Sequence, residues 1–404
     1  MERILLKRIM LIDKNKTVNY SGGVEKVICN FANEFTKRGY EVYIVCIDAE
    51  KGRPAFYLEN NVHFINLCYS YEKYDFVNFR YQLIKIQREI MRGLIGREMT
   101  FLGVKFSDPK EMYFYAEFRK RLTKCLLDIC PDIILPTDVE ATVVVNDVLK
   151  RIKRKIPVIS MCHGDPSFLK YTARGIDSLR ESQRVQVLLP EFAEFLKKLG
   201  VNNTVVIPNA VEMFSRERDK DNSREKTIIN VARIDGGGKR QEIIVEAFAT
   251  LVNKFPDWKV DFWGDIANQG YKKRLDKMIK KYGLKKYISF RGTTNDMFSV
   301  YSNADIFAFP SSHEGFGMSM VEAMSAGIPV VAYKNCKGPA AIITNEVDGF
   351  LCKDGVEDFS RKMCILMENA ELRKKMGIQA SLKALEYEPI KVWDRWEAII
   401  DDYL

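Results

Sequence analysis

The sequence lacks any hydrophobic run close to the roughly 20 residues that cross a lipid bilayer, so no transmembrane helix is expected in its 404 residues. The N-terminus, MERILLKRIMLIDKN, has Lys7 and Arg8 inside its apolar run and no small-residue cleavage site after it. It therefore does not match a secretory signal peptide. We interpret it as a first buried strand.

The nine cysteines form no C-x-x-C pair, and their number is odd. Most of them sit among apolar residues, namely Cys29, Cys46, Cys125, Cys130 and Cys364. This pattern favours reduced thiols in the core of a cytoplasmic protein over a disulfide framework.

Two nucleotide-binding patterns are also missing. Without G-x-x-x-x-G-K-[ST] a nucleotide triphosphatase loop is excluded, and without G-x-G-x-x-G a nicotinamide dinucleotide site is disfavoured. The only D-x-D match, Asp219 and Asp221, lies in the charge run SRERDKDNSREK. That run has no apolar periodicity and predicts a solvated loop, so we do not expect a metal site there.

The length of the chain indicates its domain count, whereas its net charge leaves the kind of partner open. A chain of 404 residues exceeds the usual size of one core, which favours two domains. The net charge of +9 suits a nucleic acid, an anionic membrane surface or a phosphorylated substrate equally well.

Short apolar runs alternate with longer amphipathic stretches, the pattern of βα units and parallel sheets. The break between the two halves falls between residues 205 and 226. The expected strands are 4–12, 41–47, 62–67, 132–136, 157–162 and 185–189 in the first half, then 227–232, 259–264, 288–292, 305–310 and 329–333.

Two glycine-rich turns follow expected strands. Gly22 and Gly23 precede a helical apolar stripe, and such glycines let a ligand approach the N–H groups of a helix start, although an ordinary tight turn explains the pair equally well. The second turn, VARIDGGGKRQ, adds Arg233 and Lys239. A guanidinium and an ammonium group beside such a loop could neutralise a diphosphate.

The stretch SSHEGFGMSMVEAMSAG places two glutamates seven residues apart. Glu314 is expected on a turn and Glu322 about two turns into a helix, with the free N–H groups of residues 316–319 between them. Carboxylates on both sides of an anion site would accept hydrogen bonds from the hydroxyls of a sugar nucleotide. The alternative is that both glutamates only cap and solvate the helix.

These residues resemble a known family. PSSHEGFGMSMVEAMSAGIPVVA is similar to the signature of the retaining GT-B glycosyltransferases of family four, and the likeness extends over nearly the whole chain. Its companions are SGGVEKV, VIPNAV, VARIDGGGKRQ, YSNADIFAFPSS and GPAAIITNEVDGFLC.

The resemblance implies an α/β fold of two Rossmann-like domains facing across a cleft. Residues 1–205 would form the acceptor-binding domain, with a basic and aromatic helical insertion at 76–125. Residues 206–385 would bind the nucleotide sugar, and 386–404 would form a C-terminal helix packing back on the first domain.

The resemblance also implies roles for single residues. Glu314 would contact the donor sugar, Glu322 the nucleotide ribose, and Arg233 and Lys239 the diphosphate. His163 would face the donor sugar, although a surface or satisfied core histidine is the alternative. The implied donor-binding positions are completed by Gly22, Gly23, Gly264, Gly292, Phe316, Gly317, Met318 and Ser319.

Two positions depart from the family pattern. Ala210 follows Asn209 where a glycine is common, so a turn with positive φ would be strained there. Lys239 stands one residue further from Arg233 than usual, which makes its diphosphate role less secure.

The implied function is retaining, metal-independent transfer of a hexose or N-acetylhexosamine from a nucleotide sugar to a saccharide acceptor, without a cofactor. The segment KNCKGPAAII favours UDP, and we expect a lipid-linked acceptor in surface polysaccharide or glycan assembly. A glycoside phosphorylase and a catalytically silent membrane-surface or partner-binding module on the same fold are the alternatives.

Residues 79–94 carry an apolar stripe at helical spacing with Lys85, Arg88 and Arg92 turned elsewhere. The stripe either packs on its own domain or, together with KRIKRK at 150–155, rests on an anionic membrane surface. The second alternative predicts a cytoplasmic protein held peripherally on the inner face of the cell membrane.

Overall fold

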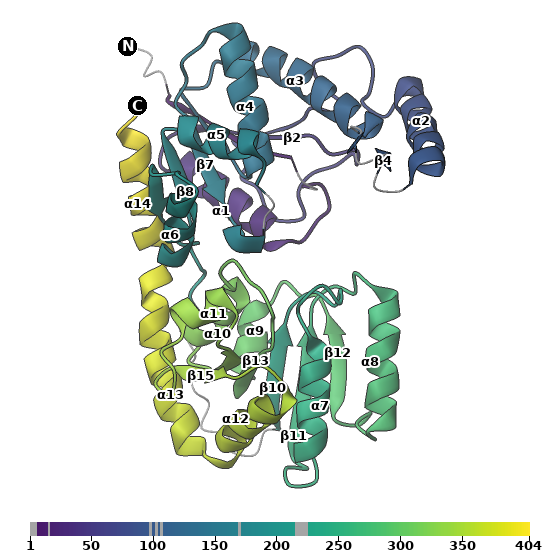
Figure 1. The fold of residues 1–404 in the computed structure, drawn as a ribbon. Coiled ribbons are helices and arrows are strands. Elements are labelled where there is room, and N and C mark those ends of the chain that lie inside the picture. Colours follow the sequence, from purple (N-terminus) through teal and green to yellow (C-terminus); the bar gives the residue numbers. More distant parts are fainter. Residues whose placement is uncertain are drawn as a thin grey trace. The chain divides into compact units, whose positions relative to one another are not determined.

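The computed structural model describes residues 6–14, 17–96, 99–101, 104–105, 108–168, 171–214 and 225–404. The D-x-D pair, Asp219 and Asp221, lies outside these residues. The chain divides into two compact units (Figure 1). Unit 1 comprises Met1–Ile207 and Arg395–Leu404, and unit 2 comprises Pro208–Asp394.

Unit 1 is built on parallel strands. One sheet has the order β3-β2-β1-β6 and another the order β7-β8-β9, and a parallel bridge between Ile134 and Val158 connects them. The strands are β1 (Arg8–Asp13), β2 (Glu41–Cys46), β3 (His63–Asn66), β6 (Ile133–Pro136), β7 (Ile159–Cys162), β8 (Arg184–Val187) and β9 (Thr204–Val206). A short antiparallel hairpin lies apart from them, formed by β4 (Thr100–Phe101) and β5 (Val104–Lys105).

The helices of unit 1 mostly connect successive strands. They are α1 (Gly23–Lys37), α2 (Phe79–Ile95), α3 (Pro109–Ile129), α4 (Val139–Ile152), α5 (Ala173–Glu181) and α6 (Pro190–Lys198). The expected helical insertion at 76–125 contains α2, the hairpin and most of α3. In α3, Arg121 is fully buried and donates hydrogen bonds to the carbonyls of Leu67, Cys68 and Tyr74, which fixes the connection leading to α2.

Unit 2 contains a six-stranded parallel sheet with the order β12-β11-β10-β13-β14-β15. Its strands are β10 (Lys226–Val231), β11 (Trp258–Trp263), β12 (Ile288–Gly292), β13 (Ile306–Phe309), β14 (Val330–Tyr333) and β15 (Gly349–Cys352). This is the strand order of a Rossmann fold, which reverses between its first and fourth strands, here β10 and β13. Ligands of such sheets bind beyond the carboxyl ends of the strands at this point.

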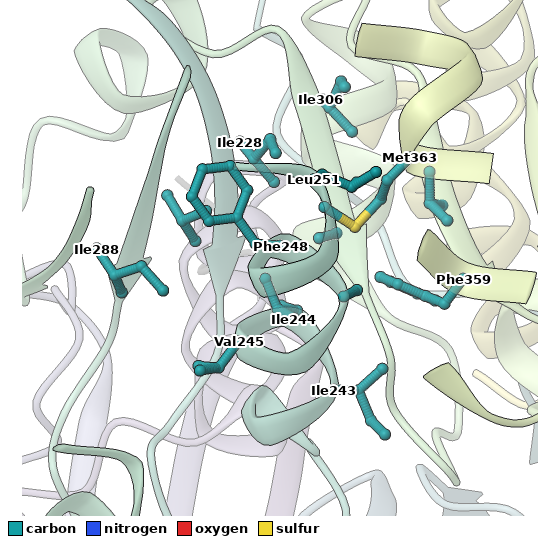
Figure 2. Close-up of a cluster of buried hydrophobic side chains, with 14 of the residues drawn as sticks. Ile228, Ile243, Ile244, Val245, Phe248, Leu251, Ile288, Ile306, Phe359 and Met363 are labelled. Atoms are coloured by element: carbon teal, nitrogen blue, oxygen red, sulfur yellow. The ribbon is translucent and has the colours of Figure 1, made fainter. Parts of the chain in front are cut away.

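The sheet of unit 2 is covered by helices. They are α7 (Gln241–Leu251), α8 (Gln269–Lys281), α9 (Met297–Ser302), α10 (Met318–Ser325), α11 (Lys337–Ile342), α12 (Val356–Glu368) and α13 (Ala370–Ala384). Figure 2 shows part of the core, where Phe248 and Leu251 of α7 lie near Ile228 of β10 and Met363 of α12. Strands β13 and β14 are buried along their whole length, which explains their continuous apolar sequences.

The final helix, α14 (Pro389–Asp401), returns to unit 1 through its second half, as predicted. Arg38 forms a 2.5 Å ion pair with Glu397, and the hydroxyl of Tyr40 donates to Asp401 at 2.9 Å. The ring of Trp396 meets that of Phe31 edge to face, with centroids 5.4 Å apart. Polar and aromatic contacts together hold the chain end on unit 1.

Every strand expected from the sequence is present, whereas β9, β15 and the short hairpin were missed. All nine cysteines are free; seven are buried, as expected of core thiols, and Cys130 and Cys364 are partly buried. The expected strain at the junction is wrong, because neither Asn209 nor Ala210 has a positive φ.

Candidate active site

The predicted site residues of unit 2 lie beyond the carboxyl ends of adjacent strands. Arg233 follows β10, Gly264 follows β11, Gly292 ends β12, and Glu314 follows β13. Parallel strands end at one edge of their sheet, so residues far apart in the sequence come together there. The edge includes the reversal point between β10 and β13.

The glycine-rich turn after β10 is held against the segment after β13. The N–H of Ser312 donates to the Gly238 carbonyl at 2.9 Å, and the hydroxyl of Ser312 donates to the same oxygen at 3.3 Å. A Cβ at Gly238 would lie 2.3 Å from Cε1 of His313, so the imidazole occupies the space that a side chain would need. The imidazole of His313 therefore helps to hold this turn in place.

Two of the predicted site residues contact each other directly. Nζ of Lys239 lies 2.5 Å from Oε1 of Glu314, and both side chains are largely shielded from solvent. The longer spacing from Arg233 thus still brings Lys239 into the site. In the same turn, Arg233 lies 3.8 Å from Asp235. A bound donor would have to share or replace the contact between Lys239 and Glu314.

The start of α10 offers backbone N–H groups to a ligand. Gly317 is the N-cap residue, with a φ of +95° that favours glycine, and it has no side chain to cap the helix. The N–H groups of Met318 and Ser319 belong to the first turn, where intrahelical acceptors are lacking. Phe316 is buried with its ring edge to face against that of Tyr387, and this contact anchors the turn. This helix start is suited to an anion.

Glu322 is buried in α10 and held by an aromatic hydroxyl. The Tyr301 hydroxyl donates to Oε2 of Glu322 at 2.6 Å, and burial followed by the Glu322 charge raises the pKa of Tyr301 well above its ordinary value. The Phe214 ring packs against Tyr301 with centroids 5.0 Å apart. Ser325 connects α10 to the segment that contains Phe214. Its hydroxyl donates to the Glu322 carbonyl and accepts from the Phe214 N–H.

Sequence reasoning missed Tyr301 as a partner of Glu322. The residue opens the stretch YSNADIFAFPSS, which was recognised only as the segment before the signature. Its role depends on a contact across 21 positions in the sequence, from α9 to α10.

The two glycines expected near the nucleotide are hydrogen-bonded to each other. The N–H of Gly264 donates to the Gly292 carbonyl at 2.8 Å. Gly264 has a φ of +137°, and a Cβ there would lie 2.2 Å from the Ala232 carbonyl oxygen. Only glycine fits this position, because the backbone at Ala232, just after the neighbouring strand β10, occupies the space.

Gly22, Gly23 and His163 belong to unit 1. Gly22 is the N-cap residue of α1, and a Cβ there would lie 2.0 Å from Oε2 of Glu25. Glu25 is buried and already brings a negative charge to this helix start. The turn therefore suits a neutral hydroxyl group better than a phosphate.

His163 follows β7, and both of its ring nitrogens are buried without a hydrogen-bond partner among the described residues. Burial lowers the pKa of His163 from 6.5 to about 4. The imidazole is therefore neutral at pH 7 and could donate one hydrogen bond and accept another. Unpartnered buried nitrogens of this kind favour a ligand-facing histidine over a satisfied core residue.

Within the described part of the chain, no group of three or more His, Cys, Asp or Glu side chains is arranged to hold a metal ion. Among the predicted site residues of unit 2, the groups able to stabilise a negative charge are Arg233, Lys239 and the start of α10. The geometry can thus hold an anion between two carboxylates that accept hydrogen bonds.

Comparison with known proteins gives two adjoining family matches. Residues 21–213 match the family described as Glycosyltransferase Family 4, and residues 212–383 match Glycosyl transferases group 1. An uncharacterized glycosyltransferase of Haemophilus influenzae is 23% identical over 387 residues, which cover 95% of this chain and 97% of the relative. The poly(ribitol-phosphate) alpha-N-acetylglucosaminyltransferase of Staphylococcus aureus is 25% identical, and the match covers 55% of this chain and 43% of that protein.

Solved structures show the same fold. The lipopolysaccharide outer core galactosyltransferase WaaB has a TM-score of 0.71 at 16% identity, covering 98% of this chain and 100% of that chain. The Anabaena protein Alr3699/HepE in complex with UDP has a TM-score of 0.72 at 18% identity, with the same coverage. The chain therefore belongs to the group 1 glycosyltransferases of family four and has the GT-B fold.

Proposed function

We propose that this glycosyltransferase moves a hexose or N-acetylhexosamine from a UDP-sugar to a saccharide acceptor with retention of anomeric configuration and without a metal ion. The observation that carries the proposal is the arrangement around α10. Its uncapped N-terminus lies between Glu314, which meets Lys239, and Glu322, which Tyr301 holds. A sugar, a diphosphate and a ribose follow one another in this order in a nucleotide sugar.

The leaving nucleoside diphosphate gains negative charge as the anomeric bond breaks. Arg233, Lys239 and the start of α10 would stabilise that charge, the largest electrostatic need of the reaction. Glu314 would accept hydrogen bonds from the sugar hydroxyls, and Glu322 from those of the ribose. Tyr301 donates to one oxygen of Glu322 and so fixes the orientation of the carboxylate.

The neutral imidazole of His163 would contribute a hydrogen bond to the sugar without adding a positive charge next to the developing oxocarbenium ion. Retention rests on the family to which the chain belongs. No residue of the site is proposed as a covalent nucleophile. The acceptor would attack on the face that the diphosphate leaves, with the diphosphate oxygen receiving its proton.

UDP is the proposed nucleotide. The Anabaena structure that shares the fold contains UDP, and so does a structure of TarM from S. aureus. In this chain, KNCKGPAAII contains the whole of α11, and Gly338 packs so closely on the Phe316 carbonyl that a Cβ would lie 2.6 Å from its oxygen. The segment that favours UDP therefore supports the signature turn directly.

A lipid-linked saccharide is the proposed acceptor. One relative is an N-acetylgalactosaminyltransferase of Campylobacter jejuni whose name specifies a diphospho-undecaprenol acceptor, 31% identical over 115 residues, which are 28% of this chain and 30% of that protein. None of the helices in the described residues combines the length and the apolar character needed to cross a membrane.

Titration calorimetry with UDP and GDP tests the donor, and we expect UDP to bind more tightly. Release of UDP from UDP-sugars, with and without EDTA, then tests transfer and metal independence, and we expect EDTA to leave the rate unchanged. Breakdown of a glycoside that requires inorganic phosphate would instead identify a phosphorylase. A folded protein that neither binds nor turns over any nucleotide sugar would identify a catalytically silent module.

A further inference from the structure

The apolar stripe of α2 is exposed. Its five large side chains recur every three or four residues, and their exposed fractions are 76% for Phe79, 48% for Leu83, 57% for Ile86, 57% for Ile90 and 77% for Leu94. The alternative in which this stripe packs on its own domain is therefore wrong. Such a continuous exposed apolar row is uncommon on a soluble monomer and marks an interaction surface.

The opposite face of α2 fixes the orientation of the helix. Tyr81 is buried, with its ring centroid 5.4 Å from that of Phe76 and 6.0 Å from that of Tyr113 in α3. At the other end, Arg92 lies 3.6 Å from Asp108, the N-cap residue of α3. Figure 1 shows α2 at the outer edge of unit 1, beyond α3. Because one face is held by α3, the stripe points away from the unit.

Basic residues outnumber acidic residues on α2. The helix carries Arg80, Lys85, Arg88 and Arg92 but only one acidic residue, Glu89. Arg88 and Arg92 are partly buried and pair with Glu89, while Arg80 and Lys85 are exposed. The sequence hypothesis combined this segment with KRIKRK at 150–155. On α2 itself, the exposed Arg80 lies next to Phe79 at the edge of the stripe, whereas the ammonium of Lys85 lies 5.4 Å from the centroid of the Tyr81 ring, away from the stripe.

We propose that this face of α2 docks on the surface of an anionic lipid bilayer. The helix of 17 residues is about 25 Å long, and its apolar ridge could enter the headgroup boundary while Arg80 at the edge of the ridge meets a lipid phosphate. An exposed apolar row on a helix that carries four cations and one carboxylate matches a fluid anionic surface, whereas a second copy of the same helix would bring like net charges together. The docking itself does not depend on the proposed function. Only its benefit, which is access to a lipid-linked acceptor, rests on that function.

Vesicle sedimentation of the full chain tests the docking. We expect binding to phosphatidylcholine vesicles only when they contain phosphatidylglycerol, and weaker binding as salt rises. The double variant Ile86→Ser and Ile90→Ser should lower the partition coefficient at least about tenfold, because two half-exposed side chains lose their apolar contact with lipid. Arg80→Gln with Lys85→Gln should lower it severalfold, and only with anionic vesicles.

The chain offers matched controls on unit 2. Ile378 and Leu382 are 48% and 56% exposed at the same helical spacing on α13, and Lys273 and Lys277 are exposed on α8. The corresponding serine and glutamine pairs should sediment with vesicles as the unsubstituted protein does. A general effect of surface hydrophobicity or charge would instead lower binding in the controls as well.

A fluorescent reporter gives a second measurement. Of the four native tryptophans, Trp258, Trp393 and Trp396 are buried and Trp263 is partly buried at the end of β11 in unit 2. Phe79→Trp adds an exposed tryptophan in the stripe, and the emission of the unsubstituted protein with the same vesicles is the reference. The emission of the variant should shift to shorter wavelength when anionic vesicles are added. No shift, or protein that stays in the supernatant at low salt, would overturn the proposal.

Two further outcomes separate the alternatives. If the Ile86 and Ile90 substitutions reduce the molecular mass in solution and vesicle binding is unchanged, the face binds a second copy and the bilayer proposal is overturned. UDP-sugar turnover is measured on the same preparations. Turnover without docking rejects only the membrane surface, whereas docking without turnover rejects only the proposed transfer.

Discussion

The substitution Glu322→Ala should separate nucleotide binding from folding when it is combined with Tyr301→Phe. Loss of a hydrogen bond between a carboxylate and a ribose hydroxyl costs about 1.5 to 3 kcal/mol, which is roughly a ten- to hundredfold weaker affinity for UDP. The same substitution leaves the buried Tyr301 hydroxyl without its 2.6 Å acceptor. That loss costs about 1 to 3 kcal/mol of stability, and the Ser319 carbonyl at 3.4 Å can offset only a part of it.

Tyr301→Phe removes the hydroxyl but keeps the ring that packs on Phe214. Because Tyr301 acts on the nucleotide through Glu322, the single variant should bind UDP only severalfold more weakly. In the double variant the orphaned hydroxyl is gone, so the thermal unfolding temperature should rise above that of Glu322→Ala. The UDP affinity of the double variant should remain that of Glu322→Ala.

Titration calorimetry with UDP and thermal unfolding, each measured on the four proteins, complete the cycle. Glu322→Gln serves as a control that keeps the shape of the side chain and an acceptor for Tyr301. If a folded Glu322→Ala protein binds UDP with unchanged affinity, Glu322 does not bind the ribose. A further loss of affinity on adding Tyr301→Phe to Glu322→Ala would show that Tyr301 contacts the nucleotide itself.

Two other predictions concern charge. Arg233→Ala should lower kcat as well as raise the KM for the donor, because the diphosphate charge that Arg233 opposes grows in the transition state. If the variant is as active as the unsubstituted protein, the diphosphate does not bind at this turn. For His163, the folded pKa of about 4 lies below the ordinary value of 6.5, so between these pH values the unfolded chain binds a proton that the native protein does not. Above pH 6.5 the titration of His163 therefore does not lower the free energy of unfolding. As the pH falls from 6.5 towards 4, it lowers that free energy by up to about 3 kcal/mol. His163→Asn should show a smaller drop in urea stability between pH 7 and pH 4.5, and identical drops would contradict a buried neutral imidazole.

Much of the fold could be predicted because parallel strands are buried on both faces. Runs such as IFAF and VVAY then have to be continuously apolar, and the pattern is visible without knowledge of the partner strands. The four-residue strand β15, GFLC, is also apolar but begins with a glycine, a residue depleted in strands, and was not recognised from the sequence. It is a strand because residues 349–352 pair with β14, and pairing between distant segments is not written in local periodicity.

The amino-acid sequence by itself determined the βα order, the glycine-capped start of α10 and the identity of the carboxylates and cations near it, since these depend on residue type and local spacing. Only the tertiary structure decided that Tyr301 holds Glu322, that Lys239 meets Glu314 across 75 positions, and that His313 packs on Gly238. It also decided which face of α2 is covered. Helical periodicity reveals that a helix has an apolar stripe, but the neighbour that covers it is chosen by packing with α3, and that packing leaves the stripe exposed.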